Sequence, residues 1–302
     1  MTGSFRLGTR ASPLAMAQAH LVRDALIAAH PSISVEICAQ VASGDKILDR
    51  ALAEVGGKAL WTKELDAALS AGDIDFAVHS MKDVETLRPA EFVIAAMPER
   101  ADVRDRLVGA ASIAALKQGA RFGTSAPRRR AQLLRLRPDL EIVLLRGNVN
   151  TRLAKIERGE ADATLLAAAG LVRLDMAGVG TAISVEELLP APSQGAIGVE
   201  CRTDDDRMRG LLASINHVAT FACVSAERAL LAGLSGDCRS PVAALALIDG
   251  GEIHFRAQIY APDGRQCEAV DTRFGVVDLA APGRIAAAML AVAHPDIKAT
   301  FG

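Results

Sequence analysis

Cationic side chains recur just after short apolar runs of this sequence, where a strand would end and a helix begin. They are Arg10, Lys82, Arg128, Arg129, Arg130, Arg146 and Arg152. In open α/β sheets, ligands bind beyond the carboxyl ends of the strands, where helix N-termini present free N–H groups to anions. Guanidinium groups bind carboxylates through two parallel hydrogen bonds. The repetition predicts a ligand with several carboxylates or phosphates, although a run such as Arg128–Arg130 taken alone is more often a solvated helix face.

Asp83 is the acidic residue in this pattern, and it stands beside Lys82 shortly after the apolar run 74–79. One interpretation is a plain surface ion pair between the two side chains. The other is a carboxylate kept ionised among cations, where it stabilises a positive centre or moves a proton. The residue types alone leave both interpretations open.

Cys238 lies in a loop sequence, residues 235–241, whereas structural cysteines usually lie in apolar periodic runs. Such runs surround Cys38, Cys201 and Cys223. Arg239 favours the thiolate form of Cys238 and Asp237 opposes it, so a special role and an ordinary loop position both remain possible. The five cysteines are odd in number and form no C-x-x-C pair. Reduced thiols in a cytoplasm are the simple interpretation.

Strands and helices that could position these residues alternate over the first two thirds of the chain. Strands are predicted at 5–8, 34–39, 74–79, 121–123, 142–145 and 164–168. Helices are predicted from Pro13 with Ser12 as N-cap, over 63–69, after Pro127 and from about Thr151. This alternation predicts parallel sheets.

The character of the sequence changes after about Thr220. A helix is predicted at 222–231, strands at 242–248, 253–260 and 266–272, and a last helix at 285–293. This succession indicates a small α+β domain. Residues 190–195 are the segment most like a hinge.

The composition bounds the class of protein. At 302 residues, with 50% hydrophobic and 23% charged, the chain predicts two or three globular domains and excludes a disordered protein. The net charge of −2 and the 3% of aromatic residues argue against a nucleic-acid partner. No apolar stretch reaches the length of a membrane span, and Arg6 and Arg10 fall where a signal peptide would be apolar.

The motifs, taken together and in order, resemble those of the porphobilinogen deaminase (hydroxymethylbilane synthase) family along nearly the whole chain. The most specific are His79–Val84 and Leu145–Val149. The others are Thr9–Ala15, Gly56-Gly57-Lys58, Gly123-Thr124-Ser125 with Arg128-Arg129, Thr151-Arg152-Leu153, Ala169-Gly170-Leu171 with Arg173, Gln194-Gly195-Ala196 and the Cys238 loop.

The resemblance implies a fold and a division into domains. Two α/β domains like those of type 2 periplasmic binding proteins would enclose a cleft, followed by a small C-terminal α+β domain. The implied boundaries are 1–97 with 196–214 for the first domain, 98–195 for the second and 218–302 for the third, which carries the cysteine.

The resemblance also implies a reaction. Four porphobilinogen molecules condense head to tail, with loss of ammonia each time, to give hydroxymethylbilane. The product grows on a dipyrromethane cofactor joined through a thioether to the loop cysteine, here Cys238. No metal, nucleotide, nucleic acid or membrane is implied, and a cytoplasmic monomer is expected.

Residue roles follow from the same resemblance. Asp83 would act on the pyrrole nitrogens as the catalytic residue, because a carboxylate there stabilises positive charge. The cofactor would be held by Ser80, Lys82, Thr124, Ser125, Arg128, Arg129 and Arg152, with Lys58 nearby. Substrate and the elongating chain would be bound by Arg10, Ser12, Arg146 and Arg173.

The sequence departs from the family pattern at a few positions. Glu54 stands where many relatives have lysine, and Ala126-Pro127 replaces a Ser-Leu pair, which removes one hydroxyl. Trp61 replaces phenylalanine, and Asp237 replaces a glycine. None of these changes removes a central residue. The alternative function is a non-catalytic polyanion-binding protein of the periplasmic type, in which the domain carrying Cys238 would have no purpose.

Overall fold

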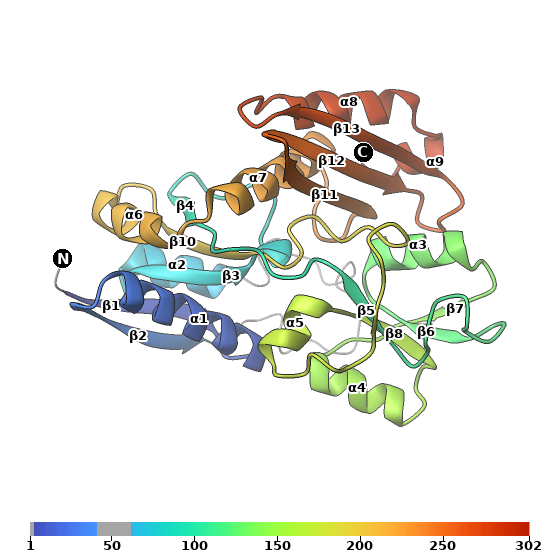
Figure 1. The fold of residues 1–302 in the computed structure, drawn as a ribbon, viewed down its shortest axis with the longest axis horizontal. Helices are drawn as coiled ribbons and strands as arrows, with labels where there is room; N and C mark the ends of the chain where they lie inside the picture. The colour runs from blue at the N-terminus through green and yellow to red at the C-terminus, as the bar shows by residue number, and fades with distance from the viewer. Residues whose placement is uncertain (1–2, 41–61, 302) are drawn as a thin grey trace. The chain divides into compact units, whose positions relative to one another are not determined.

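The computed structural model describes residues 3–40 and 62–301 (Figure 1). These residues form two compact units. Unit 1 comprises 3–40, 62–101 and 195–221, and unit 2 comprises 102–194 and 222–301. The chain therefore leaves unit 1 after residue 101 and returns to it at residue 195.

Unit 1 is built on a five-stranded sheet of order β2-β1-β3-β10-β4. Its strands are β1 (Gly3–Arg10), β2 (Ile33–Gln40), β3 (Phe76–Ser80), β4 (Phe92–Ala96) and β10 (Ile197–Arg202). β1 pairs in parallel with β2 and β3, whereas β10 runs antiparallel to β3 and β4. The expected parallel pairing is confirmed for β1, β2 and β3 but not for β10, which enters the sheet from the returning chain.

Helices cover both faces of this sheet. They are α1 (Pro13–Ala29), α2 (Lys63–Ala71), α6 (Asp206–Leu212) and the 3₁₀ turn η3 (Ala213–Ile215). The unit also contains the 3₁₀ turn η2 (Met81–Asp83) and the start of α7 (Val218–Gly233). α1 and α6 pack on Phe76 and Val78, whereas α2 packs on Ala77, as expected for side chains that alternate along a strand. The predicted N-cap Ser12 is confirmed, with Pro13 in the first turn.

Unit 2 repeats the strand order in the sheet β7-β6-β8-β5-β9. Its strands are β5 (Asp105–Val108), β6 (Arg121–Gly123), β7 (Glu141–Val143), β8 (Ala163–Ala167) and β9 (Thr181–Ala182), and its helices are α3 (Pro127–Leu136), α4 (Val149–Glu157) and α5 (Ala168–Arg173). Here β5 is the strand that runs antiparallel, to β8 and β9. Two sheets with the same order and one antiparallel strand each confirm the predicted α/β fold class, that of type 2 periplasmic binding proteins.

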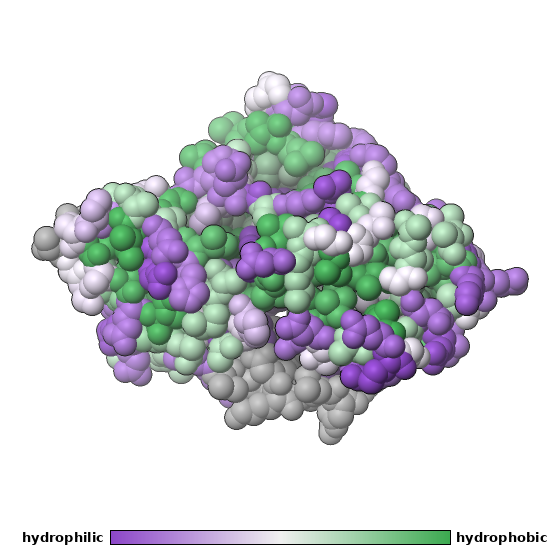
Figure 2. Space-filling model, turned by 60° about the horizontal axis from the view of Figure 1, so that its bottom comes forward, coloured by the Kyte–Doolittle hydropathy of each residue, from purple (hydrophilic) through white to green (hydrophobic). Residues whose placement is uncertain are grey.

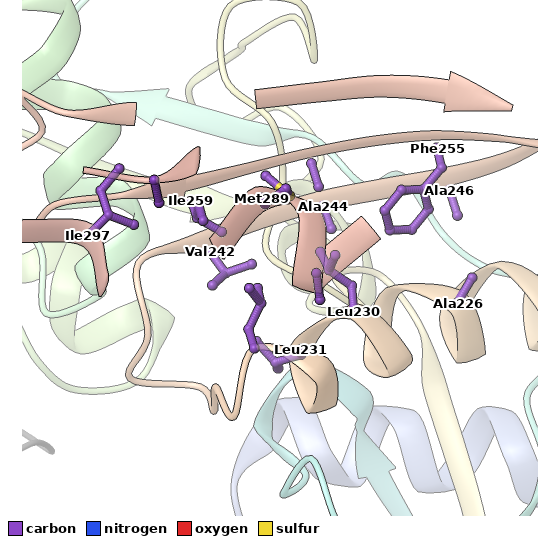
Figure 3. Packing of buried hydrophobic residues seen from close by; sticks show 14 of the residues in the cluster. Ala226, Leu230, Leu231, Val242, Ala244, Ala246, Phe255, Ile259, Met289 and Ile297 are labelled. Carbon is purple, nitrogen blue, oxygen red and sulfur yellow. The ribbon is translucent and has the colours of Figure 1, made fainter. Parts of the chain in front are cut away.

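The C-terminal part of unit 2 is a three-stranded antiparallel sheet covered by helices. Its strands are β11 (Val242–Asp249), β12 (Glu252–Tyr260) and β13 (Cys267–Gly275), and its last helices are α8 (Ala281–Val292) and α9 (Pro295–Lys298). Leu230 of α7, Phe255 and Ile259 of β12 and Met289 of α8 meet in one apolar core (Figure 3). The predicted small α+β element is confirmed.

Two predicted boundaries shift for local reasons. β3 begins at Phe76 rather than Ile74, because the Ile74 N–H bonds the Ala68 carbonyl and so belongs to the end of α2. α7 begins at Val218, four residues before the predicted start, because His217 accepts a hydrogen bond from the Thr220 N–H in its first turn. The strands β4, β5, β9 and β10 were not predicted.

Hydrophilic residues are scattered among hydrophobic ones over the face shown in Figure 2. None of the helices in residues 3–40 and 62–301 is long and apolar enough to cross a membrane.

Candidate active site

The turn that follows β3 holds the predicted catalytic carboxylate. Asp83 ends the 3₁₀ turn η2 and lines a pocket in unit 1 together with Arg10 and Ser80. The other lining residues are Ala15, Gln18, Thr62, Val78, His79 and Val84. β1 and β3 are parallel neighbours, so their carboxyl ends bring Arg10 and Asp83 to one place. No ion pair joins Asp83 to a cation within residues 3–40 and 62–301, which disfavours a surface pair with Lys82.

Ser80 is fixed in this pocket by a glutamine of α1. The Gln18 Nε2 donates to the Ser80 Oγ at 2.9 Å, and the Ser80 hydroxyl donates to the Gln18 Oε1 at 3.1 Å. Ser12 is engaged at the start of the same helix, where its Oγ accepts from the Ala15 N–H at 3.3 Å. Lys82 and Arg10 are both half-buried, so their charged ends keep some access to solvent.

A buried ionic network lies directly behind the pocket. The His79 Nε2 is 3.0 Å from the Glu200 Oε2, and the Arg88 Nε donates to the Glu200 Oε1 at 2.8 Å. Arg88 also contacts Asp66 at 2.5 Å and Glu85. Burial alone would raise the pKa of Glu200, but the hydrogen bonds and charges of His79 and Arg88 outweigh it and lower this pKa to about 2. Glu200 is therefore an ionised carboxylate that holds His79 at the pocket wall.

Arg128 and Arg129, which were predicted to bind a ligand, are buried and paired with a carboxylate of the protein. Both are buried in the first turn of α3 and share the fully buried carboxylate of Asp105, at 2.9 and 2.7 Å. The Gln194 Nε2 donates to the same carboxylate at 2.9 Å. Burial would raise the pKa of Asp105, but the charges of Arg129 and Arg128 hold it well below its usual range. Two cations share one anion here, which leaves one net positive charge.

The residues before α3 show what the departure from the family pattern does. Ala126 is the N-cap of α3 and Pro127 begins the helix, so no side chain caps it. The Thr124 Oγ1 instead accepts from the Ala126 N–H at 3.2 Å. Thr124 is buried and Ser125 is half-buried, both just beyond the end of β6.

The loop after β7 positions two further predicted arginines. Gly147 has φ 118°, and a Cβ there would approach the Thr151 side chain to 2.6 Å, so only glycine fits. Asn148 then caps α4 by accepting from the Thr151 N–H at 2.9 Å. This tight turn directs Arg146 into a buried position, while Arg152 donates to the Gly147 carbonyl at 2.9 Å.

Arg173 ends α5, the short helix after β8. Burial lowers the pKa of its guanidinium to about 10. Desolvation of this kind makes a nearby anion favourable, because an anion restores part of the lost solvation.

All five cysteines lie in the described residues, and Cys238 is the one that is exposed. Its loop joins α7 to β11. Arg239 is paired with Asp237 at 2.7 Å, so the two charges that flank the thiol largely offset each other. Burial raises the pKa of Cys267 and Cys201, in keeping with structural thiols.

Some predicted residues cannot be placed, and others were missed. Lys58, Glu54 and Trp61 lie outside the described residues. Two missed residues, Gln18 and Asp105, hold the predicted site residues Ser80 and Arg129 through hydrogen bonds. A third, Glu200, holds His79, which lines the pocket. Gln18 had a signal, since it stands four residues from both Leu14 and Val22 on the apolar face of α1.

Each of the two α/β sheets places cations beyond the ends of its strands, unit 1 adds the carboxylate of Asp83, and the loop between α7 and β11 carries an exposed thiol. The chain belongs to the porphobilinogen deaminase family. Residues 5–210 match that family's dipyromethane cofactor binding domain, and residues 221–290 match its C-terminal domain.

Curated relatives agree over nearly the whole length. The porphobilinogen deaminase of Sphingopyxis alaskensis is 59% identical over 98% of this chain and 96% of that protein. That of Paracoccus denitrificans is 49% identical over 92% of this chain and 90% of that protein. A periplasmic substrate-binding protein of an ABC transporter from Coxiella burnetii has a TM-score of 0.42 and 15% identity, covering 74% of this chain and 96% of that one. The fold assignment rests on the strand order described above.

Proposed function

We propose that the chain is a hydroxymethylbilane synthase, which condenses four porphobilinogen molecules head to tail with loss of one ammonia at each step. The observation that carries this proposal is that Arg10 and Asp83 line one pocket. Porphobilinogen carries carboxylates beside a pyrrole ring that becomes electron-poor when ammonia leaves. An arginine for the carboxylates and a carboxylate for the ring N–H are the two groups that such a substrate needs.

Asp83 is proposed to stabilise the positive charge that develops on the pyrrole ring. Asp83 makes no ion pair with the residues that the structure describes, 3–40 and 62–301, so its negative charge stays available for the substrate. The end of β3, which leads into the turn of Asp83, is held by the Gln18–Ser80 pair and by the His79–Glu200 contact. A preorganised charge of this kind acts on the transition state without rearrangement.

The family's dipyrromethane cofactor fits the residues that are present. Cys238 is proposed as its attachment point, because an exposed thiol can form a thioether and the four other thiols are buried or half-buried. When bound, the cofactor supplies the pyrrole end on which the first condensation takes place. Its carboxylates are proposed to be held by Lys82, Arg128, Arg129 and Arg152, with Ser80, Thr124, Ser125 and Lys58.

The pair Arg128–Arg129 supports this role through its charge rather than through free hydrogen bonds. Asp105 neutralises one of the two guanidiniums, and the remaining positive charge is buried. A buried net charge is costly, so an incoming carboxylate is favoured there. Arg10, Ser12, Arg146 and Arg173 are proposed to bind the substrate and the elongating chain.

The proposed domain division is 1–97 with 196–214, then 98–195, then 218–302. It is supported by the three separate sheets and their own apolar cores. A cytoplasmic monomer is proposed as well, and five cysteines without a disulfide support the location.

Intact mass measurement together with activity tests the proposal. The purified protein should be heavier than its bare chain by one dipyrromethane, and it should convert porphobilinogen with release of ammonia. Cys238→Ser should lose both the added mass and the activity. Cys267→Ser is the matched control and should keep both, since Cys267 is half-buried at the start of β13. A fully active protein with the bare chain mass would contradict the assignment of Cys238.

A further inference from the structure

Met81 differs from its two neighbours in the turn η2. Its side chain is fully buried, whereas Lys82 and Asp83 are half-buried beside it. The Met81 N–H donates to the Ala196 carbonyl at 3.1 Å, and the Val84 N–H donates to the Met81 carbonyl at 3.3 Å. The turn that carries the proposed catalytic carboxylate is therefore anchored through Met81 to the chain entering β10.

The side chain of Met81 lies over a glycine of β10. Gly198 is the register partner of His79 in β3. A Cβ atom added to Gly198 would overlap the Met81 Sδ and would lie 3.0 Å from the Met81 Cγ and 3.6 Å from the Ile94 Cγ2. The Met81 side chain thus fills the space that a Cβ atom would need, and only the hydrogen atom of a glycine fits beside it.

A larger residue at this position would act on the turn. Met81 is flexible in itself, but protein interiors are close-packed and leave a fully buried side chain little room to turn away. Displacement of Met81 would be passed through one peptide bond to Lys82 and through two to Asp83. The neighbouring network of Glu200 and His79 fixes β3, so the turn is the part able to yield.

We propose that Gly198 is a positioning residue for the reaction: by leaving room for Met81, it sets where Lys82 and Asp83 stand in the pocket. The proposal rests on the proposed function of Asp83. It places a determinant of activity in β10, a strand that is distant in sequence from the turn it supports.

The test compares Gly198→Ala with Gly8→Ala on protein shown by mass to carry the cofactor. Gly8 is the matched control, because a Cβ at Gly8 meets Ile74 and Leu65 under α2, away from the turn. Both variants overpack the same sheet and should lower the melting temperature. Only Gly198→Ala should lower kcat, by about tenfold or more, since a displacement of about 1 Å at a catalytic group can cost about a hundredfold. KM should change less than kcat, because Arg10 is not moved.

Relief of the overlap gives a second, independent readout. Gly198→Ala combined with Met81→Ala should have a higher kcat than Gly198→Ala alone, although a purely structural role predicts that the two losses multiply. If Gly198→Ala does not fold, Met81→Ile crowds the same contact from the side of the turn and should lower kcat with the cofactor in place.

Several outcomes would overturn the proposal while leaving the function intact. One is that the wild type is active and Gly198→Ala has the same kcat as Gly8→Ala. The others are that the double variant has a lower kcat than Gly198→Ala, or that Met81→Ile is fully active. A wild type that does not consume porphobilinogen would instead remove the function proposed for the chain.

Discussion

Helices α1 and α3 occupy the same place in their two sheets, since each follows the second strand in the order of its sheet and begins with proline. α1 has a side-chain cap at Ser12 and a half-buried Arg10 before it at a pocket. α3 has no side-chain cap and buries Arg128 and Arg129 against Asp105. Equivalent positions in the two sheets therefore carry cations in different environments. Arg10 is half-buried at a pocket, whereas Arg128 and Arg129 are buried against a carboxylate.

The two units also differ in the sign of their buried charge. In unit 1, Arg88 contacts the three carboxylates of Asp66, Glu85 and Glu200, and Glu200 also contacts His79. In unit 2, two arginines surround one aspartate. The first arrangement holds a histidine and an arginine in place, and the second leaves one positive charge buried, which is proposed to attract a carboxylate of the cofactor. Arginines that look equivalent in sequence thus differ in how far neighbouring carboxylates of the protein neutralise their charge.

The largest expected effect is that of Asp105→Asn, which leaves two buried guanidiniums without their anion. Breaking a buried ion pair on one side costs about 3–5 kcal/mol, so the free energy of unfolding in urea should fall by about that amount. Asp102→Asn is the control: Asp102 pairs with the half-exposed Arg104 at 2.7 Å and should cost at most about 1 kcal/mol.

The same variant bears on the cofactor. If cofactor carboxylates approach Arg128 and Arg129, they should replace part of the missing charge, so cofactor loading should stabilise Asp105→Asn more than it stabilises the wild type. Equal stabilisation of both proteins would place Arg128 and Arg129 in a purely structural role.

The carboxylates of these two clusters also explain why periodicity did not indicate two of the strands, β5 and β10. Apolar runs revealed β1, β3 and β8, because parallel central strands are buried on both faces. β5 begins with the buried Asp105, and β10 carries the buried Glu200 in its middle. A charged residue in a short run breaks the apolar pattern, and its compensating arginines lie far away in the sequence. The antiparallel strands, and with them the crossing of the chain between units, were therefore not predictable from periodicity.

The candidate site was predictable to a similar extent. Motifs at strand ends indicated Arg10, Lys82 and Asp83, because loops after strands leave their polar residues accessible. Burial of Arg128 and Arg129 depends on a partner in another strand, which a single sequence does not reveal. Lys58 stays a prediction.

Glu200→Gln should produce the next largest effect, and its size should depend on pH. The folded-state pKa of Glu200 is lowered from 4.5 to about 2, so its contribution is present above pH 4.5 and is lost as the pH falls toward 2. The contribution is roughly 3 kcal/mol on the scale of about 1.4 kcal/mol per pKa unit. Unfolding free energies measured across this window should fall more steeply in the wild type than in Glu200→Gln. Parallel curves would mean that His79 and Arg88 do not favour the ionised form.

Asp83→Asn should separate chemistry from stability. Loss of a preorganised electrostatic group lowers turnover by about a hundredfold or more, whereas the unfolding free energy should change by at most about 1 kcal/mol, because Asp83 is half-buried. The measurement is steady-state turnover of porphobilinogen on protein shown by mass to carry the cofactor. Near-normal turnover there would remove Asp83 from the catalytic role and would leave the pocket as a binding site alone.

The smallest expected effect is that of Ser12→Ala, and it tests the accessible half of the comparison. The Ser12 hydroxyl caps α1, and loss of such a cap costs about 1 kcal/mol of unfolding free energy. Ser12→Asn keeps an acceptor at the N-cap and should restore most of that loss. Ser12 is also proposed to bind substrate, and that role should appear separately as a higher KM in both variants at unchanged kcat. If Ser12→Asn recovers both stability and KM, Ser12 acts through the helix cap and holds Arg10 in place only indirectly. If stability alone recovers, the hydroxyl itself contacts the substrate, and the start of α1 contributes a ligand contact that the uncapped start of α3 does not have at Ala126.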